Sequence, residues 1–193
     1  MKLPPNEKYF LILWIMANAV GWILGVIVAL MLAALQETIH LGNAVYIGLG
    51  MGWTVGLAQW LVARKWFGAT IRWMWAPALG MTTSFLFADL LRLDQSVAAL
   101  PLFAAIGGLL TGLLQKDLPR SRSSLARRWA IVSAVAWMCP ALLVAVLLVP
   151  GHPRTLLESV RNLGSIASGG VVLGIITGVS LVSFVHAEST VSQ

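Results

Sequence analysis

Charged residues are scarce in this chain of 193 amino acids. Lysine, arginine, aspartate and glutamate make up 10% of it, whereas 59% of the residues are hydrophobic. A soluble domain carries about 25% charged residues, and so little charge cannot cover the surface of a water-soluble globule. The composition therefore argues against a soluble enzyme or binding domain and predicts a protein that lies in lipid.

Cysteine is nearly absent and the common catalytic motifs are missing. The single cysteine, Cys139, lies within an apolar run, which excludes a disulfide framework and a cysteine metal cluster. There is no His-Glu-x-x-His zinc helix, no phosphate-binding loop and no pair of carboxylates inside an apolar run. We therefore expect no enzyme activity, no catalytic residue and no metal site.

Histidine is rare as well, and none of the three copies lies in the middle of an apolar run. His40 and His152 follow the ends of such runs, and His186 lies at the end of the last one. Axial ligation of haem or chlorophyll usually places the imidazole within a span, so haem is not expected. A pigment bound through His40 stays open, and the cofactor is therefore unknown apart from bound lipid.

What the sequence does contain is six apolar runs. A helix needs about 20 mostly apolar residues to cross a hydrocarbon core of about 30 Å, and the segments between the runs are polar, basic or rich in proline and glycine. We predict an all-α membrane protein with six transmembrane helices in a single polytopic domain over residues 1–193. The runs are 9–35, 44–63, 73–91, 97–114, 129–149 and 163–185.

Basic residues lie unevenly about these runs and predict the orientation. Ten of the 13 lysines and arginines lie before the first run, after the second or after the fourth, and three lie on the other side. Because positive residues collect on the cytoplasmic side, both termini are expected in the cytoplasm. The net charge of +6 then serves orientation and anionic lipid headgroups, and nucleic acid is not expected as a partner.

The six runs read as three repeated helical hairpins, over about residues 9–63, 73–115 and 129–185. The odd-numbered runs align on a tryptophan in their first halves, and each even-numbered run carries small residues four positions apart. Residues four apart share one helix face, and small residues let helices approach closely in lipid. Three copies in one orientation allow a pseudo-threefold axis along the membrane normal. The predicted packing residues are Gly21, Gly25, Gly48, Gly52, Gly56, Gly108, Gly112, Gly170, Gly174 and Gly178.

A few polar residues interrupt the apolar runs. Asn18, Gln59 and Gln115 are amides that can hydrogen-bond between helices or line a polar path through the membrane. Asp89 lies one turn before the end of the third run. An acid at this depth is often functional, although Arg92, three residues on, can neutralise it. Interhelical bonding is the simpler interpretation of all four candidates, and a polar path is the alternative.

Six of the nine tryptophans lie near the predicted cytoplasmic boundary. Indole rings at headgroup level anchor helices in the membrane, and we interpret these residues as such a belt. The alternative is a stacking surface for a pigment, quinone or lipid. The six are Trp14, Trp60, Trp66, Trp73, Trp75 and Trp129.

Two phrases carry a resemblance to other proteins: ANAVGWILG over Ala17–Gly25 and GLAQWLVARKW over Gly56–Trp66. They resemble a loose group of uncharacterised small multi-pass proteins of cyanobacteria and other phototrophic or filamentous bacteria. The resemblance implies a six-helix bundle in a bacterial inner, intracytoplasmic or thylakoid membrane. It implies no activity and assigns no functional residue.

These observations favour a non-enzymatic accessory or scaffold subunit of a larger membrane complex, photosynthetic or respiratory if the resemblance holds. Ionisable groups, which pumps and transporters use for coupling, are scarce in the runs, whereas small-residue faces favour helix packing. The expected partners are membrane lipids and other membrane-protein subunits. The alternative is a small transporter or channel, with a path between the hairpins lined by Gln59, Gln115, Thr111 and Thr177. A membrane enzyme is a third possibility, for which Glu37, His40, Asp89 and His152 would have to converge.

Overall fold

The computed structural model describes residues 6–35, 42–93, 97–115, 123–147 and 156–191. This part of the chain is helical, which confirms the all-α class predicted from the sequence. It holds six α-helices and one short 3-10 helix: α1 (Glu7–Ala34), α2 (Asn43–Phe67), α3 (Arg72–Leu90), η1 (Val97–Ala99), α4 (Leu100–Leu114), α5 (Ser123–Leu147) and α6 (Leu156–Val191).

The sequence sets the helix ends by ordinary capping chemistry. Asn6 precedes α1 and accepts a hydrogen bond from the backbone N–H of Tyr9 at 3.1 Å, which satisfies one of the free donors of the first turn. Gly68 ends α2 in the left-handed conformation, with φ of 65°, where glycine avoids the steric cost of a side chain. Pro101 lies in the first turn of α4, where its missing N–H is not needed.

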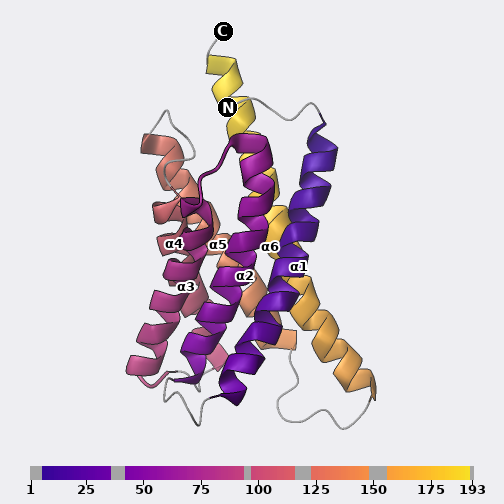
Figure 1. Cartoon of the computed structure of the whole chain (residues 1–193), viewed down its shortest axis with the longest axis vertical. Coiled ribbons are helices and arrows are strands. Elements are labelled where there is room, and N and C mark those ends of the chain that lie inside the picture. Colours follow the sequence, from indigo (N-terminus) through magenta and orange to yellow (C-terminus); the bar gives the residue numbers. More distant parts are fainter. Residues whose placement is uncertain (1–5, 36–41, 94–96, 116–122, 148–155, 192–193) are drawn as a thin grey trace.

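The helices form a closed ring in chain order. Each α-helix packs against the next one along the chain, and α6 returns to pack against α1. Figure 1 shows the helices running alternately up and down, with the N- and C-terminal ends of the chain at the same end of the bundle. We call this end, which holds Glu7 and His186, the terminal end, and the end that holds Ala44 and Asp89 the opposite end.

Two groups of buried side chains fill the ring. The central cluster draws residues from all six α-helices, and Trp22 of α1 and Trp137 of α5 meet in it with ring centroids 5.9 Å apart. The terminal cluster lies nearer the terminal end and consists of Phe10, Trp14, Ala63, Trp73, Trp129 and Leu181. The axis of the ring is therefore filled by aromatic side chains at two levels.

The outward-facing surface is apolar along most of its length. Large hydrophobic side chains are exposed on every α-helix whose side chains are described, among them Leu30, Leu79, Leu109 and Val146. In a water-soluble protein such a surface would be a liability, whereas it suits hydrocarbon.

Four helical segments are long and apolar enough to cross a membrane: Glu7–Ala34, Ala44–Phe67, Leu125–Leu147 and Gly164–Ala187. The other two helices are less suited by these criteria. Helix α4 is apolar but has 15 residues, which is about 22 Å at 1.5 Å per residue. Helix α3 has 19 residues, and Arg72, Asp89 and a Thr-Thr-Ser sequence lower its hydropathy. The chain thus has the character of a membrane protein.

Candidate functional site

The three tryptophans on which the odd-numbered helices align, Trp14, Trp73 and Trp129, meet inside the ring. The ring centroids of Trp14 and Trp73 are 6.4 Å apart, and those of Trp73 and Trp129 are 5.9 Å apart. Their exposed fractions are 0%, 3% and 3%. The interpretation of these three residues as a boundary belt is therefore wrong, because they pack against one another across the axis. The tryptophan shared by the three aligned segments was the sequence signal for this cluster. The usual enrichment of tryptophan at the membrane surface favoured a boundary position instead.

Two of the three indoles donate hydrogen bonds to a neighbouring helix. Trp14 Nε1 donates to Thr177 Oγ1 of α6 at 2.8 Å, and Trp129 Nε1 donates to Gln115 Oε1 of α4 at 3.0 Å. In each case an odd-numbered helix is joined to the even-numbered helix that precedes it around the ring. Trp73 Nε1 is buried and has no hydrogen-bond acceptor among the described residues.

Asn18 and Gln59 come together beside this cluster. Gln59 Nε2 donates to Asn18 Oδ1 at 2.8 Å, and Asn18 Nδ2 donates to the carbonyl oxygen of Trp14 at 2.8 Å. The exposed fractions of Asn18 and Gln59 are 0% and 3%. Since buried amides are costly in an apolar medium unless they are bonded, this relay both satisfies the amides and ties α2 to α1.

Gln115 compensates for a backbone defect that a proline creates. Pro77 lies inside α3 and has no N–H, so the carbonyl oxygen of Trp73, four residues earlier, lacks its helical partner. Gln115 Nε2 donates to this oxygen at 3.4 Å. The same amide therefore joins α4 to α3 through its nitrogen and to α5 through its oxygen.

Asp89 lies at the opposite end and is separate from these amides. Its two carboxylate oxygens accept hydrogen bonds from the backbone N–H groups of Ala44 at 3.0 Å and Val45 at 2.8 Å. These are free donors of the first turn of α2, where the helix dipole also favours a negative charge. Within the described residues no ion pair with Arg92 accompanies these bonds, so the expected neutralisation by Arg92 is not found. The acid caps a neighbouring helix instead.

The glycine stripes of the even-numbered helices face the next odd-numbered helix around the ring. A methyl group at Gly52 would lie 2.5 Å from the carbonyl oxygen of Pro77 in α3, and one at Gly112 would lie 2.5 Å from Ala130 Cα in α5. One at Gly174 would lie 2.8 Å from Ile15 Cα in α1. We call these three contacts, α2/α3, α4/α5 and α6/α1, the seams. They lie between the predicted hairpins rather than within them.

The remaining glycines among the predicted packing residues also lie at close contacts between helices, either at the seams or between α1 and α2. Gly21 and Gly25 of α1 face α2, where added methyl groups would meet Val55 Cα at 3.0 Å and Met51 Cα at 2.9 Å. The others face the seams: Gly48 and Gly56 at α2/α3, Gly108 at α4/α5, and Gly170 and Gly178 at α6/α1.

The buried hydroxyl groups contribute little to a continuous polar path. Thr111 Oγ1 donates to the carbonyl oxygen of Gly107, and Thr177 Oγ1 donates to that of Leu173, each four residues earlier in its own helix. Such bonds are the usual way in which a hydroxyl is satisfied inside a membrane helix. The buried polar side chains of the described residues are all neutral, either amides or hydroxyls.

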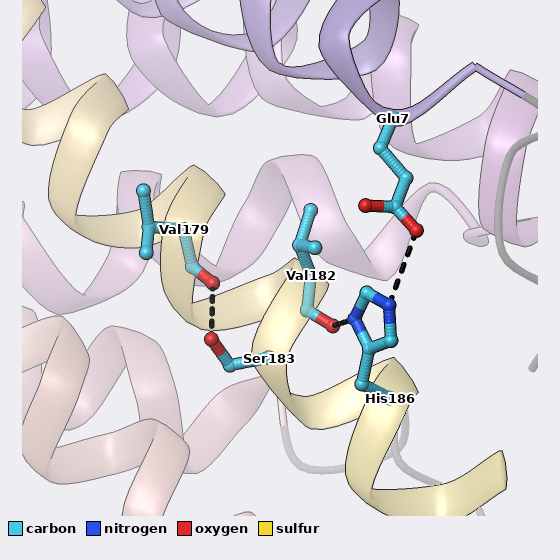
Figure 2. A network of polar contacts seen from close by, with 5 residues as sticks. All are labelled: Glu7, Val179, Val182, Ser183 and His186. Carbon is cyan, nitrogen blue, oxygen red and sulfur yellow. Dashed lines mark hydrogen bonds and ion pairs between the residues drawn. The ribbon is translucent and has the colours of Figure 1, made fainter.

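At the terminal end, two basic side chains lie against tryptophan rings and a histidine lies beside a glutamate. Arg64 lies 4.7 Å from the ring centroid of Trp60, and Lys65 Nζ lies 5.8 Å from that of Trp66. Figure 2 shows His186 of α6 beside Glu7 of α1, with Nε2 and Oε1 3.2 Å apart. The His186 side chain is 53% exposed and that of Glu7 39%, so solvent reaches and screens this contact.

The described residues contain no group of three or more histidine, cysteine or acidic side chains that could hold a metal ion. Cys139 is half-buried and free. Glu37, His40 and His152, on which the enzyme and pigment alternatives rest, lie outside the described residues. Of the candidate residues, the structure thus brings together Asn18 and Gln59, places Gln115 beside Trp73 and Trp129, and holds Asp89 apart.

No protein family, no curated protein and no solved structure matches this chain.

Proposed function

We propose that the chain is an integral membrane protein whose six α-helices all cross the bilayer, with both termini in the cytoplasm. The four long apolar segments and the apolar outer surface support this proposal. The basic side chains Arg64 and Lys65 at the end of α2 support the orientation, because positive residues favour the cytoplasmic side. Helices α3 and α4 would cross as the two shorter members of the ring, packed against each other and against α2 and α5.

We further propose a structural role, as an accessory or scaffold subunit of a larger membrane complex. The observation that carries this proposal is the state of the interior, where aromatic clusters fill the axis and amides are bound between helices. An interior so filled provides rigidity rather than a route or a reaction centre. The apolar surface is then available to lipid and to other subunits.

The decisive experiment is purification of the protein from its native membrane in mild detergent, followed by mass spectrometry and an absorption spectrum. Co-migration with a large complex is the expected result, and the spectrum reports whether a pigment accompanies it. Isolation as a colourless monomer or small oligomer would contradict the accessory role. The orientation is tested separately, by labelling cysteines introduced near either end of the chain with a membrane-impermeant reagent in intact cells.

A small transporter or channel is the second candidate, and one observation favours it. Asn18, Gln59 and Gln115 are buried amides close to the axis of a closed ring, where a path would run. The test is flux through the protein reconstituted in vesicles, compared with the double variant Gln59→Leu and Gln115→Leu. Flux that the double variant abolishes, in protein that remains folded, would favour transport over the structural role.

A further inference from the structure

The indole N–H of Trp73 is a buried donor that the described protein groups leave unused. Trp73 is 3% exposed and lies between Trp14 and Trp129. Both of these neighbours donate to side chains of an adjacent helix. A buried polar group without a partner is rare in native structures, and a bound water molecule is a common reason for one.

The helix register places Gln59 beside Trp73. A methyl group at Gly56 would meet the carbonyl oxygen of Met74, and one at Gly112 would meet Ala130 Cα. Met74 and Ala130 each follow a leading tryptophan by one residue, and the two glycines each precede a glutamine by three. Gln59 therefore lies relative to Trp73 as Gln115 lies relative to Trp129.

The two glutamines nevertheless use their amides differently. Gln115 accepts directly from Trp129 Nε1 at 3.0 Å. Gln59 donates its Nε2 to Asn18 at 2.8 Å, and α3 and α5 have Pro77 and Ser133 where α1 has Asn18. Asn18 thus engages Gln59 Nε2 and leaves Gln59 Oε1 as the remaining acceptor of this amide.

We propose that Trp73 and Gln59 bind one internal water molecule between α2 and α3. The water accepts a hydrogen bond from Trp73 Nε1 and donates one to Gln59 Oε1, which gives the buried indole a partner. Two polar partners are the minimum for a buried water. With this water, each of the three seams has an indole bonded to the preceding helix, directly in two seams and through water in the third. The inference is independent of the proposed function.

The test is nuclear magnetic resonance of the full chain in mild detergent with its tryptophan indoles labelled with nitrogen-15. The Trp73 indole resonance is assigned by its loss in Trp73→Phe. We expect a cross-peak between the Trp73 indole proton and water, with the sign that marks spatial contact rather than chemical exchange. The Trp129 indole proton, which is bonded directly to Gln115, should show none.

Two variants assign the partner. Gln59→Leu should abolish the water cross-peak of Trp73, because the second partner of the water is removed. Thr177→Val serves as the matched control, since it removes the acceptor of Trp14 and should change the Trp14 resonance while leaving the Trp73 cross-peak intact.

Absence of a water cross-peak at Trp73 in the unmodified protein would overturn the proposal. A Trp73 resonance that then shifts upfield in Gln59→Leu would show a direct bond to Gln59 instead. A cross-peak that survives Gln59→Leu would overturn the role of Gln59. If Gln59→Leu does not fold, the unmodified protein alone decides whether water is bound.

Discussion

The α2/α3 and α4/α5 seams are built alike in their backbones and differently in their polar contacts. In both, a glycine stripe lies against the backbone of the next helix. The α4/α5 seam has a direct indole–amide bond inside the bundle, from Trp129 to Gln115. The α2/α3 seam has none between described side chains there and is instead capped at the opposite end by Asp89. Close packing therefore defines the ring, whereas the polar contacts are adapted seam by seam.

Overpacking either seam should have the largest effect on the free energy of unfolding, because both seams depend on close approach of a glycine to the backbone of the next helix. Gly52→Leu and Gly112→Leu would each place a side chain where the neighbouring backbone already lies within 2.5 Å. We expect each to lower the free energy of unfolding by about 3 kcal/mol, measured as the midpoint of unfolding by sodium dodecyl sulfate in mild detergent. Gly164→Leu is the control, since no atom lies within 4 Å of a methyl group at that position. Equal losses in all three variants would contradict the seams.

Loss of the Gln115 amide should have the second-largest effect on the free energy of unfolding, and should cost the α4/α5 seam more than loss of the Gln59 amide costs its helix contacts. Gln115→Leu leaves both Trp129 Nε1 and the carbonyl oxygen of Trp73 without a partner. We expect a loss of about 2 kcal/mol for these two bonds, against about 1 kcal/mol for the one bond to another side chain, that to Asn18, lost in Gln59→Leu. A double-mutant cycle between Gln115→Leu and Trp129→Phe measures the indole bond directly. A coupling energy of zero would show that this bond does not stabilise the α4/α5 seam.

The Asp89 cap should matter to the α2/α3 seam alone. Asp89→Ala removes both acceptors at the start of α2, and we expect it to cost about 1 kcal/mol, the usual value of such a cap. Asp89→Asn keeps one acceptor and should lose less. Unfolding midpoints of these variants and of Arg92→Ala provide the measurement. A loss in Arg92→Ala as large as that in Asp89→Ala would indicate an ion pair instead of a cap.

The smallest effect on the unfolding midpoint is expected from the contact between Glu7 and His186, at the surface of the α6/α1 seam. His186 and Glu7 are exposed, and exposed ion pairs contribute about 0.5 kcal/mol or less. Glu7→Gln should therefore leave the unfolding midpoint nearly unchanged, at low and at high salt. Trp14→Phe, which removes the buried bond of the same seam to Thr177, is the comparison. If Glu7→Gln were the more harmful of the two, the buried indole bond would not be what stabilises this seam.

Much of the fold follows from the sequence because one physical requirement governs it. A helix in hydrocarbon satisfies its own backbone groups, so the apolar runs locate the helices, although α5 and α6 begin six and seven residues before the predicted runs 129–149 and 163–185. The predicted run 44–63 corresponds to α2 and the run 97–114 to η1 and α4. The polar candidates were also found by composition, since an amide within an apolar run is conspicuous.

The contacts of these candidates could not be predicted, because sequence gives the face of a residue but not its neighbour. Arg92 lies within one helical turn of Asp89, so local spacing favoured an ion pair between them. The observed partner of Asp89 is the beginning of α2, where Ala44 lies 45 residues away in sequence. Trp14, Trp73 and Trp129 lie in the first halves of their helices, and the sequence placed them near the membrane boundary, where tryptophan usually meets headgroups. Their burial depends on the ring closing around them. The glycine spacing likewise did not reveal that the stripes face between hairpins.

Closure of the ring through α6 and α1 has a consequence for biosynthesis. Gly174 and Thr177 of α6 contact Ile15 and Trp14 of α1, so α1, which is synthesised before α6, waits for α6 before this part of its interior face is covered. Until then the indole N–H of Trp14 and the open side of the terminal cluster have no cover from α6. A chain that stalls before α6 would therefore present an incomplete ring, with an open apolar face and one indole N–H without its acceptor.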